Sequence, residues 1–282
     1  MSDPERPDSR TRRSGGPIAA ATPTVLLTGA AGGVGTFLRT RLPRLSWRLR
    51  CFDLALPAQD GGLEWVAGDI TRPEDLSVAM DGVDAVVHLA GIPGEAAFER
   101  LLHTNIDGTY QVFEAARQAR VRRLVYASSN HAIGRHRAGT VLSGAATARP
   151  DSLYGVSKAF GEALGSYYAD RFGMAVACVR IGSCFERPTR LRHLATWLSP
   201  GDAVRLVHAL LTAPGLTFAT VNGISANTRA WWELDGAKEL GYAPQDDAER
   251  YAPELLAEFG GPLAADDPDA VFAGGTVRAP ED

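Results

Sequence analysis

The sequence predicts an α/β protein in which helices cover both faces of a parallel sheet, a doubly wound arrangement. Short apolar runs alternate with longer helical patterns through much of the 282-residue chain, as in strand–helix–strand units. The apolar runs are nearly continuous Val, Ile, Leu and Ala, which is typical of strands buried on both faces. A glycine-rich loop joins the first strand candidate directly to the first helix candidate. Together these three features favour an open doubly wound sheet.

The expected elements follow one another in a regular order up to about residue 181. Strands are expected at Thr24–Thr28, Arg48–Asp53, Leu63–Ala67, Ala85–Leu89, Arg123–Ala127, Ala175–Ile181 and Phe218–Val221. Helices are expected at Val34–Leu42, Pro73–Met80, Ala96–Ala119, Leu153–Phe172 and Asp202–Leu211. Most of these helices stand between two strands, where a parallel sheet needs a crossover.

The composition is that of a globular protein with a substantial core, because 45% of the residues are hydrophobic and 22% are charged. A net charge of -4 gives no nucleic-acid footprint and no charged tail. The three cysteines, Cys51, Cys178 and Cys184, include no Cys-x-x-Cys pair. We therefore expect buried free thiols, with neither a disulfide framework nor a metal site.

Three segments are expected along the chain. Residues 1–22 are rich in Pro, Ser, Arg and Gly, which predicts a disordered N-terminal extension. Residues 23–181 carry the regular strand–helix pattern and are expected to form the sheet domain. In residues 182–282 the pattern loosens, so we expect a small lobe and tail, intertwined with that domain. Such a lobe would pack over the carboxyl edge of the sheet, where ligands bind in open α/β folds.

The location of the protein is predicted from the segments near its N-terminus. Arg12 and Arg13 raise the alternative of twin-arginine export. The next apolar run, Thr24–Leu27, leads straight into the glycine loop and is better used as a core strand. No apolar run approaches the length of a membrane span. We therefore expect a cytoplasmic protein with no membrane partner.

The glycine-rich loop predicts a dinucleotide site. It has the spacing G-x-x-G-x-x-G and reads Gly29, Ala30, Ala31, Gly32, Gly33, Val34 and Gly35. Glycines let the backbone turn sharply and approach a pyrophosphate, whose charge then lies at the N-terminus of the following helix. A glycine run elsewhere would be an ordinary turn. The position between the first strand and the first helix favours dinucleotide binding.

Three further strand ends predict contacts to the same dinucleotide. Asp53 ends the second strand and can accept hydrogen bonds from ribose hydroxyls, which favours NAD over NADP; an ordinary strand-end aspartate is the alternative. Asp69 and Ile70 follow the third strand and are candidates to meet the adenine, although Asp69 would also suit a cap before Thr71. Leu89, Ala90 and Gly91 close the fourth strand with small residues that allow close backbone approach.

Tyr154 and Lys158 are the candidates for proton chemistry. They are four residues apart, so one helix presents both side chains on the same face. A phenol titrates near pH ~10, but a neighbouring ammonium favours the phenolate and lowers its pKa. A tyrosine in this position can take a proton from an alcohol. Taken alone, the same spacing also occurs on exposed helix faces.

Polar residues near the fifth strand complete the candidate site. Ser129, within Ser128-Ser129-Asn130-His131, can orient a substrate oxygen, or the segment is a simple turn after a strand. Asn105 is a poor helix former inside a predicted helix and either holds a water in a proton path or makes a local polar contact. His88 is interpreted as a satisfied core histidine. His131 has no obvious base partner.

Taken together, the glycine loop, Asp53, Ser129, Tyr154 and Lys158 resemble an extended short-chain dehydrogenase/reductase. Longer segments resemble the uronate dehydrogenase family in particular, from about Val25 to the C-terminal region. They are Ser128–Gly134, Arg149–Lys158, Val179–Cys184, Leu194–Ser199, Ala226–Asn227 and Trp231–Trp232. The resemblance implies a Rossmann domain, the cofactor NAD and a Ser129–Tyr154–Lys158 triad with Asn105 as fourth member. It also implies that Lys158 holds the nicotinamide ribose.

For function, the resemblance implies oxidation of a hexuronic acid such as D-glucuronate or D-galacturonate at C1 to the aldarolactone, with Tyr154 as base. It implies substrate contacts from Ser129, Asn130, His131, Ser183 and Arg192, with Arg192 on the sugar carboxylate. A guanidinium suits a carboxylate, but sequence alone rates Arg187 and Arg190 almost equally. Pro93 departs from the family, which has a serine there.

Two alternatives remain at this point. One is a sugar-nucleotide epimerase or dehydratase on the same scaffold, which the short C-terminal portion disfavours. The other is a non-catalytic NAD-sensing protein, which the intact triad disfavours because a sensor needs no base. Extended dehydrogenases often associate, so a homo-oligomer is possible, but no interface is identified in the sequence.

Overall fold

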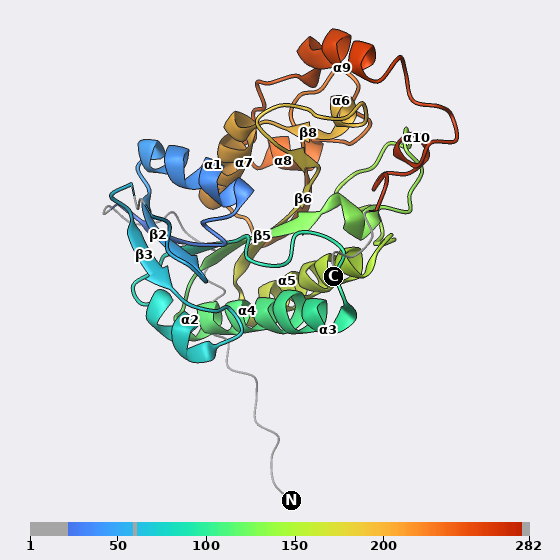
Figure 1. Ribbon diagram of the computed structural model, residues 1–282. Helices are drawn as coiled ribbons and strands as arrows, with labels where there is room; N and C mark the ends of the chain where they lie inside the picture. The colour runs from blue at the N-terminus through green and yellow to red at the C-terminus, as the bar shows by residue number, and fades with distance from the viewer. Residues whose placement is uncertain (1–21, 59–60, 278–282) are drawn as a thin grey trace, which may run out of the picture.

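A parallel β-sheet forms the centre of the molecule (Figure 1). The computed structural model describes residues 22–58 and 61–277. Within them the main sheet has seven strands in the order β3-β2-β1-β4-β5-β6-β9. The strands are β1 (Thr24–Thr28), β2 (Arg48–Asp53), β3 (Glu64–Ala67), β4 (Ala85–His88), β5 (Arg123–Ser129), β6 (Ala175–Ile181) and β9 (Phe218–Gly223). The order turns back beside β1, so the sheet is doubly wound, which confirms the predicted fold class.

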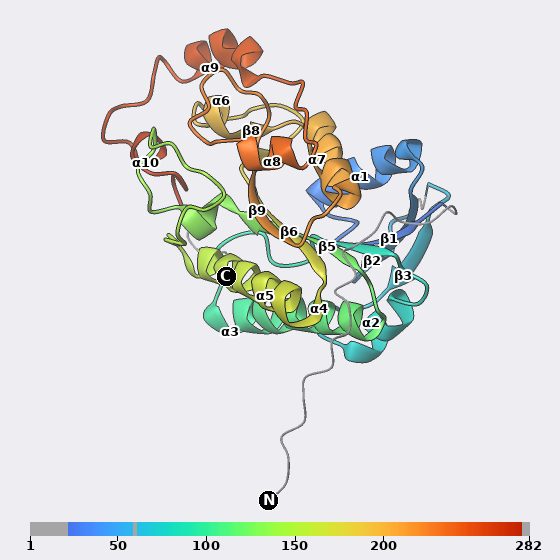
Figure 2. The same cartoon turned by 180° about the vertical axis from the view of Figure 1, so that it is seen from behind.

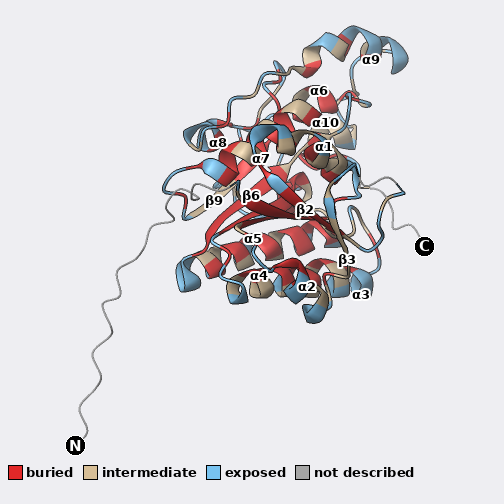
Figure 3. Cartoon of the chain, turned by 90° about the vertical axis from the view of Figure 1, so that its left-hand side faces the viewer, coloured by how far each residue is buried: buried red, intermediate tan, exposed pale blue. Residues whose placement is uncertain are grey.

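Helices cover both faces of this sheet. Helices α1 (Gly33–Arg41) and α7 (Pro200–Thr212) lie on one face, and α2 (Pro73–Ala79), α4 (Gly108–Gln118) and α5 (Leu153–Phe172) lie on the other (Figures 1 and 2). Short 3₁₀ turns occur at Leu42–Leu45, Asn130–Ile133 and Ala248–Tyr251. The buried residues concentrate along the sheet and on the inner faces of the helices (Figure 3). The two helical layers exclude water from both sides of the strands.

The core is divided by the sheet into two apolar clusters. Val25 and Leu27 of β1 pack in the cluster that includes Leu38 of α1. Leu26, between them, packs in the opposite cluster with Phe113 of α4. All five side chains are fully buried. Successive strand side chains point to opposite faces, so a continuous apolar run is what a strand between two helical layers requires.

The predicted helix over Ala96–Ala119 is present over Phe98–Gln118, but it contains a π-helical turn that the sequence did not predict. The segment consists of α3 (Phe98–Leu101), a π-helical turn over Leu102–Asp107, and α4. Asn105, inside the wide turn, is buried and bonds through its side chain to the backbone of Ile92. A π turn adds a residue to the helix and changes which side chains face inward. The interruption therefore serves a tertiary contact that helical periodicity does not report.

The residues after 181 supply both sheet elements and a group of short elements beyond its carboxyl edge. Strand β9 and helix α7 join the main layers, whereas α6, β8, α9 and α10 lie above β6 in Figure 1. The short elements are β7 (Ser183–Cys184), α6 (His193–Thr196), β8 (Trp197–Leu198), α8 (Asp235–Glu239), α9 (Ala252–Glu258) and α10 (Pro268–Val271). A small apolar cluster around the fully buried Trp197 packs part of this group. The domain boundary at residue 181 stays a prediction.

Two predictions about the whole chain concern its N-terminus and membranes. The N-terminal extension, residues 1–22, lies outside the described residues except for residue 22, and so do Arg12 and Arg13. Over residues 22–58 and 61–277, no helix is both long and apolar enough to cross a membrane.

Candidate active site

The predicted site residues meet at the carboxyl edge of the sheet. Strands β1, β2, β4 and β5 each end at a candidate segment, and parallel strands place their carboxyl ends at one edge. The strand order turns back between β1 and β4, and ligands of open α/β sheets bind beside such a point. The chain therefore folds so that residues from five distant segments share one region.

The glycine loop between β1 and α1 is held in a shape that side chains would prevent. Gly29 has a φ of 69°, in the left-handed region that favours glycine. A Cβ on Gly29 would lie 2.7 Å from the backbone nitrogen of Ala90, and one on Gly35 would collide with the carbonyl oxygen of Gly29. At Gly33, by contrast, a Cβ would have open space around it. The loop thus packs tightly against the protein on one side and leaves the N-terminus of α1 accessible.

The carboxylates of Asp53 and Asp69 accept hydrogen bonds from nearby residues. Asp53 accepts from the backbone nitrogens of Ala31 and Leu54, each at 2.8 Å, so its carboxylate lies beside the glycine loop. Asp69 accepts from the backbone and hydroxyl of Thr71 at 2.9 and 2.8 Å. The carboxyl pKa of Asp69 is lowered because these bonds outweigh its partial burial. Asp69 therefore closes a local turn onto Thr71 and does not cap α2, whose N-cap is Arg72. Its contact with the adenine stays a prediction, and Ile70 beside it is buried.

The segment after β4 is tied to α5 through Asn105. Leu89 and Ala90 follow β4, and their backbone nitrogens bond back to Thr28 at the end of β1. The Asn105 amide accepts from Ile92 N at 2.7 Å, donates to Ile92 O at 3.1 Å and donates to Ser157 Oγ at 3.1 Å. Gly91, where φ is 149°, leaves room for this amide. Asn105 thus makes polar contacts with two distant segments, and its role in holding a water in a proton path stays a prediction.

Helix α5 presents Tyr154 and Lys158 as predicted, in its first two turns. The helix begins after Ser152, whose hydroxyl accepts from Gly155 N at 3.0 Å. Glu95, from the segment after β4, accepts from the backbone nitrogens of Leu153 and Tyr154 at 3.2 and 3.0 Å. These caps satisfy the first free N–H groups of the helix. They also fix the backbone of the tyrosine itself.

The electrostatics of this pair differ from the sequence-based expectation. The pKa of Tyr154 is raised to about 12, because the effect of burial outweighs that of a hydrogen bond with Ser129, which lowers it. Burial lowers the pKa of Lys158 to about 8. The Lys158 ammonium donates to the carbonyl of Ala127 at 2.9 Å and lies 5.6 Å from the Tyr154 ring centroid. The prediction that Lys158 lowers the Tyr154 pKa is therefore wrong: burial raises this pKa, and the opposing contribution comes from the hydrogen bond with Ser129.

Ser129 and Arg192 are linked through the side chain of Asn130. In the amide orientation that satisfies its neighbours, Asn130 donates to Ser129 Oγ at 3.2 Å and to Ile181 O at 3.3 Å. Its oxygen accepts from Arg192 Nη2 at 3.3 Å. Ser129 also caps the short turn after it, by accepting from His131 N at 3.2 Å. The turn and the orienting role predicted for Ser129 are therefore compatible.

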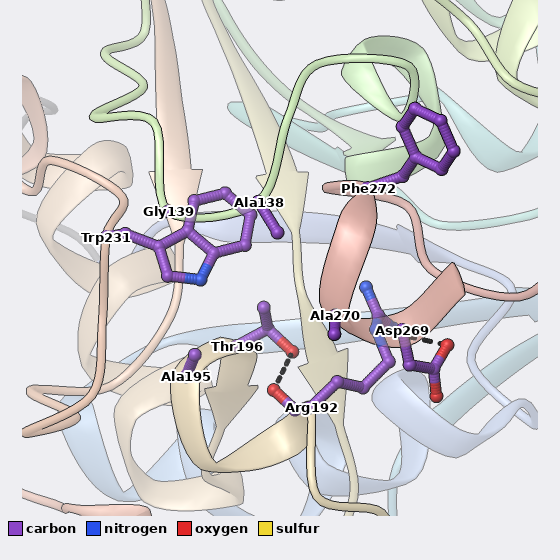
Figure 4. Close-up of a pocket in the computed structure, with 9 residues that line it drawn as sticks. All are labelled: Ala138, Gly139, Arg192, Ala195, Thr196, Trp231, Asp269, Ala270 and Phe272. Atoms are coloured by element: carbon purple, nitrogen blue, oxygen red, sulfur yellow. Dashed lines mark hydrogen bonds and ion pairs between the residues drawn. The ribbon is translucent and has the colours of Figure 1, made fainter. Parts of the chain in front are cut away.

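A pocket of about 250 Å³ lies beside Arg192 (Figure 4). Its lining comes from the segment after β5, from α6 with its N-cap, from the segment between β9 and α8, and from α10 with the residue after it. The residues are Ala138, Gly139, Arg192, Ala195, Thr196, Trp231, Asp269, Ala270 and Phe272. The Arg192 guanidinium donates to the carbonyl of Ala273 at 2.8 Å and lies 3.9 Å from Asp269. Burial lowers its pKa, and the charge of Asp269 opposes this effect.

The other two arginines considered for the substrate carboxylate lie differently. Arg187 is exposed, with 59% of its side chain accessible, and pairs with Glu254 at 3.0 Å. Arg190 is 38% accessible and lies 3.7 Å from Asp269, whereas the Arg192 side chain is only 12% accessible. Arg192 also contacts Asn130. The structure therefore separates three residues that spacing alone could not separate.

Ser183 and His88 have clear hydrogen-bond partners, and the three cysteines are free thiols. Ser183, at the start of β7, is buried and shares a 3.1 Å hydrogen bond with the hydroxyl of Thr196. His88 is 1% exposed and bonds to Thr28 and Thr109, so its interpretation as a satisfied core histidine is confirmed. Cys184 is a free thiol of intermediate exposure, unlike the buried Cys51 and Cys178.

Sequence reasoning missed the partner of His131. Its Nδ1 lies 3.0 Å from both carboxylate oxygens of Asp151. Its ring is edge-on to the Tyr154 ring, with the two ring centroids 5.8 Å apart. In the sequence, Asp151 is only one member of the segment before α5. No local signal pairs two residues separated by 20 positions. Glu95 and Asp269 were missed for the same reason, whereas Trp231 lies in a segment that carries the predicted resemblance.

A comparison with protein families agrees with this geometry. Residues 25–199 match the model of the NAD dependent epimerase/dehydratase family. The chain belongs to the NAD dependent epimerase/dehydratase family. This family description includes the predicted cofactor, and the matched region runs from β1 to the N-cap of α7.

Within this epimerase/dehydratase family, the similarity to uronate dehydrogenases is extensive. The uronate dehydrogenase of Pseudomonas putida is 42% identical over 253 residues, covering 89% of this chain and 94% of that protein. The one from Agrobacterium fabrum is also 42% identical and covers 89% and 95%. A mutant Agrobacterium tumefaciens uronate dehydrogenase complexed with NAD superposes with a TM-score of 0.85 at 41% identity, covering 90% and 96%. The predicted resemblance is confirmed.

The residues present fit the family's NAD. The N-cap of α1 is Gly32, so no side chain of the N-cap residue occupies the first N–H groups of the helix, and the first turn carries no acidic residue. The N–H groups of α1 can therefore receive a pyrophosphate. The open space at Gly33 permits that approach. Asp53 lies beside the loop and offers carboxylate oxygens to ribose hydroxyls. The buried ammonium of Lys158 lies next to Tyr154, where it can contact a second ribose.

Proposed function

We propose that this chain is a uronate dehydrogenase that oxidises a hexuronic acid, such as D-glucuronate or D-galacturonate, at C1 to the aldarolactone. One observation carries the proposal: a buried arginine, Arg192, lies one side chain away from the serine that contacts the candidate base. Asn130 bridges Arg192 and Ser129 with bonds of 3.3 and 3.2 Å. A substrate held between them would be an alcohol that also bears a carboxylate. The similarity to uronate dehydrogenases supports the same substrate class.

Each side chain has a defined task in this proposal. Arg192 binds the carboxylate of the sugar, because a guanidinium matches two carboxylate oxygens with two parallel hydrogen bonds. Ser129 and Asn130 orient the anomeric hydroxyl, and Ser183 and His131 bind other hydroxyls. Tyr154 takes the proton of the anomeric hydroxyl at its phenolic oxygen. The chemistry supplied by bound NAD is acceptance of the hydride that leaves C1.

The cofactor contacts are part of the same proposal. Backbone N–H groups at the start of α1 bind the pyrophosphate, and Asp53 binds the adenosine ribose. Ile70 and Asp69 face the adenine, while Leu89, Ala90 and Gly91 let the backbone pass close to the dinucleotide. Lys158 binds the nicotinamide ribose, and the hydrogen bond of Ser129 with Tyr154 favours the phenolate as the proton is taken. Asn105 keeps the segment after β4 against α5.

The chain region assigned to the substrate is the lobe over residues 182–282, which contributes Ser183 and Arg192 to the site. Pro93 is exposed and offers neither a hydroxyl nor an N–H, so we propose that one sugar hydroxyl lacks the contact that the family serine provides. Cytoplasmic location and a homo-oligomeric state remain predictions.

The test is an assay of NAD reduction with the purified chain. Glucuronate and galacturonate are compared with glucose and galactose, which have the same anomeric centre but no carboxylate. We expect NADH formation with the acids and at least about 100-fold lower kcat/KM with the neutral sugars, because they leave the buried guanidinium unpaired. No turnover with any uronate would refute the function. Equal turnover of acids and neutral sugars would refute the role of Arg192.

A further inference from the structure

A buried carboxylate with no assigned role lies behind the candidate substrate site. Asp151 precedes the N-cap of α5, and its side chain is 5% accessible. Both of its oxygens are 3.0 Å from Nδ1 of His131, and Oδ1 also accepts from the Ser152 hydroxyl at 3.0 Å. Burying a carboxylate is costly unless it is paired and hydrogen-bonded. The contact with His131 is therefore part of what makes this position tolerable for a charge.

The position of the carboxylate is fixed by two glycines. A Cβ at Gly134 or at Gly274 would collide with Oδ2 of Asp151. The two glycines also bond to each other, because Gly274 N donates to Gly134 O at 3.0 Å. The C-terminal segment thus closes over the carboxylate and leaves it little freedom. Asp151 is held as a rigid acceptor facing the His131 ring.

An ionised carboxylate can only accept hydrogen bonds, so Nδ1 of the facing imidazole must carry a proton. In a neutral imidazole the other nitrogen, Nε2, is then an acceptor. The His131 ring lies beside the Tyr154 ring, with centroids 5.8 Å apart and planes at 71°. An acceptor next to the base suits a sugar hydroxyl, which has a proton to donate.

We propose that Asp151 is a positioning residue that holds His131 as the Nδ1–H tautomer, so that Nε2 accepts a hydrogen bond from a hydroxyl of the bound sugar. The sugar contact rests on the proposed function, whereas the tautomer does not. Burial lowers the pKa of Arg192, and the charges of Asp269 and, more weakly, of Asp151 oppose this effect.

The tautomer is measured directly by nitrogen-15 NMR of the full chain at a pH where His131 is neutral. The His131 signals are assigned by their absence in His131→Ala. We expect a protonated Nδ1 and an unprotonated Nε2, and loss of this preference in Asp151→Ala. An Nε2–H tautomer in the wild-type chain would overturn the proposal. Because the measurement uses the wild-type chain, a failure of Asp151→Ala to fold leaves the test intact.

Kinetics with glucuronate test what the tautomer does. In Asp151→Ala we expect the KM for glucuronate to rise about tenfold, as for one lost hydrogen bond in a buried site. The kcat and the KM for NAD should change less than about twofold, because Asp151 contacts neither the base nor the glycine loop. The matched control is Asp170→Ala, an exposed aspartate on α5, which should change none of these values.

A double-mutant cycle separates positioning from a general structural role. If Asp151 acts through His131, adding Asp151→Ala to His131→Ala should raise the KM for glucuronate by less than about twofold further. An undiminished penalty in the His131→Ala background would overturn the proposal, and so would a parallel rise in the KM for NAD. A wild-type chain that turns over no uronate would refute the proposed function and the sugar contact, while the NMR measurement would still decide the tautomer.

Discussion

The two ends of the candidate site are built in different ways. At the reacting end, Ser129 ends β5 and Tyr154 and Lys158 stand on α5, so sheet register and helix caps position them. At the acid end, Arg192 precedes the short helix α6 and is held by Ala273, 81 residues away, and by Asp269. The contrast teaches that regular secondary structure positions the reacting side chains, whereas contacts between distant segments position the arginine proposed to bind the substrate carboxylate. Substitutions at the two ends should therefore change different kinetic constants.

The largest effect is expected at the reacting end. Tyr154→Phe should lower kcat for uronate oxidation by about 10³-fold, because it removes the general base. NAD binding, measured by calorimetry, should be retained. Tyr167→Phe is the control, since this residue is on the same helix but 54% exposed. More than about a tenth of wild-type kcat in Tyr154→Phe would contradict the assignment of the base.

At the acid end the effect should fall on KM instead. Arg192→Ala should raise the KM for glucuronate about 100-fold, as for the loss of a charge-assisted bidentate pair. The kcat and the KM for NAD should change far less. Arg187→Ala is the matched control, because that arginine is exposed and paired with Glu254. If both variants raised the KM equally, the carboxylate would not be bound where we place it.

A smaller effect, visible in the pH profile, is expected for Ser129→Ala. The hydrogen bond from Ser129 lowers the pKa of Tyr154, so its removal raises that pKa and leaves less phenolate at any pH below it. The acid limb of kcat/KM should therefore move to higher pH, and the rate on that limb should fall about tenfold for each pH unit that the limb moves. Ser128→Ala, which loses a bond to Glu162 instead, should leave the limb in place. If the acid limb stayed in place in Ser129→Ala, the hydrogen bond from Ser129 would not control the pKa of Tyr154.

The smallest effect separates cofactor approach from loop packing. Gly33→Ala should raise the KM for NAD roughly fivefold by crowding the helix N-terminus, while the melting temperature stays near that of the wild type because a Cβ there meets nothing within 4 Å. Gly35→Ala should instead destabilise the fold, since its Cβ would collide with the carbonyl of Gly29. Thermal melts and NAD titrations of both variants decide the point. A destabilised Gly33→Ala would show that packing, not cofactor access, requires this glycine.

Local patterns predicted the elements of the sheet domain closely. The bounds of β1, β2 and β6, and of α5, agree with the sequence-based expectation, because apolar runs, the Ser152 cap and the C-terminal Gly173 are signals carried by the segments themselves. The π-helical turn inside the helix predicted over Ala96–Ala119 was missed for the opposite reason. It places Asn105 against Ile92 and Ser157, which are neighbours only after folding.

By itself, the sequence determined the doubly wound fold, the glycine loop and the shared helix face of Tyr154 and Lys158. These follow from strand and helix periodicity and from the conformational freedom of glycine. The tertiary structure alone decided that Arg192 faces Asn130, that His131 faces Asp151 and that burial raises the pKa of Tyr154 against a hydrogen bond with Ser129. Hydrogen bonds and burial depend on distances in space, which residues far apart in the chain acquire only when the chain is folded.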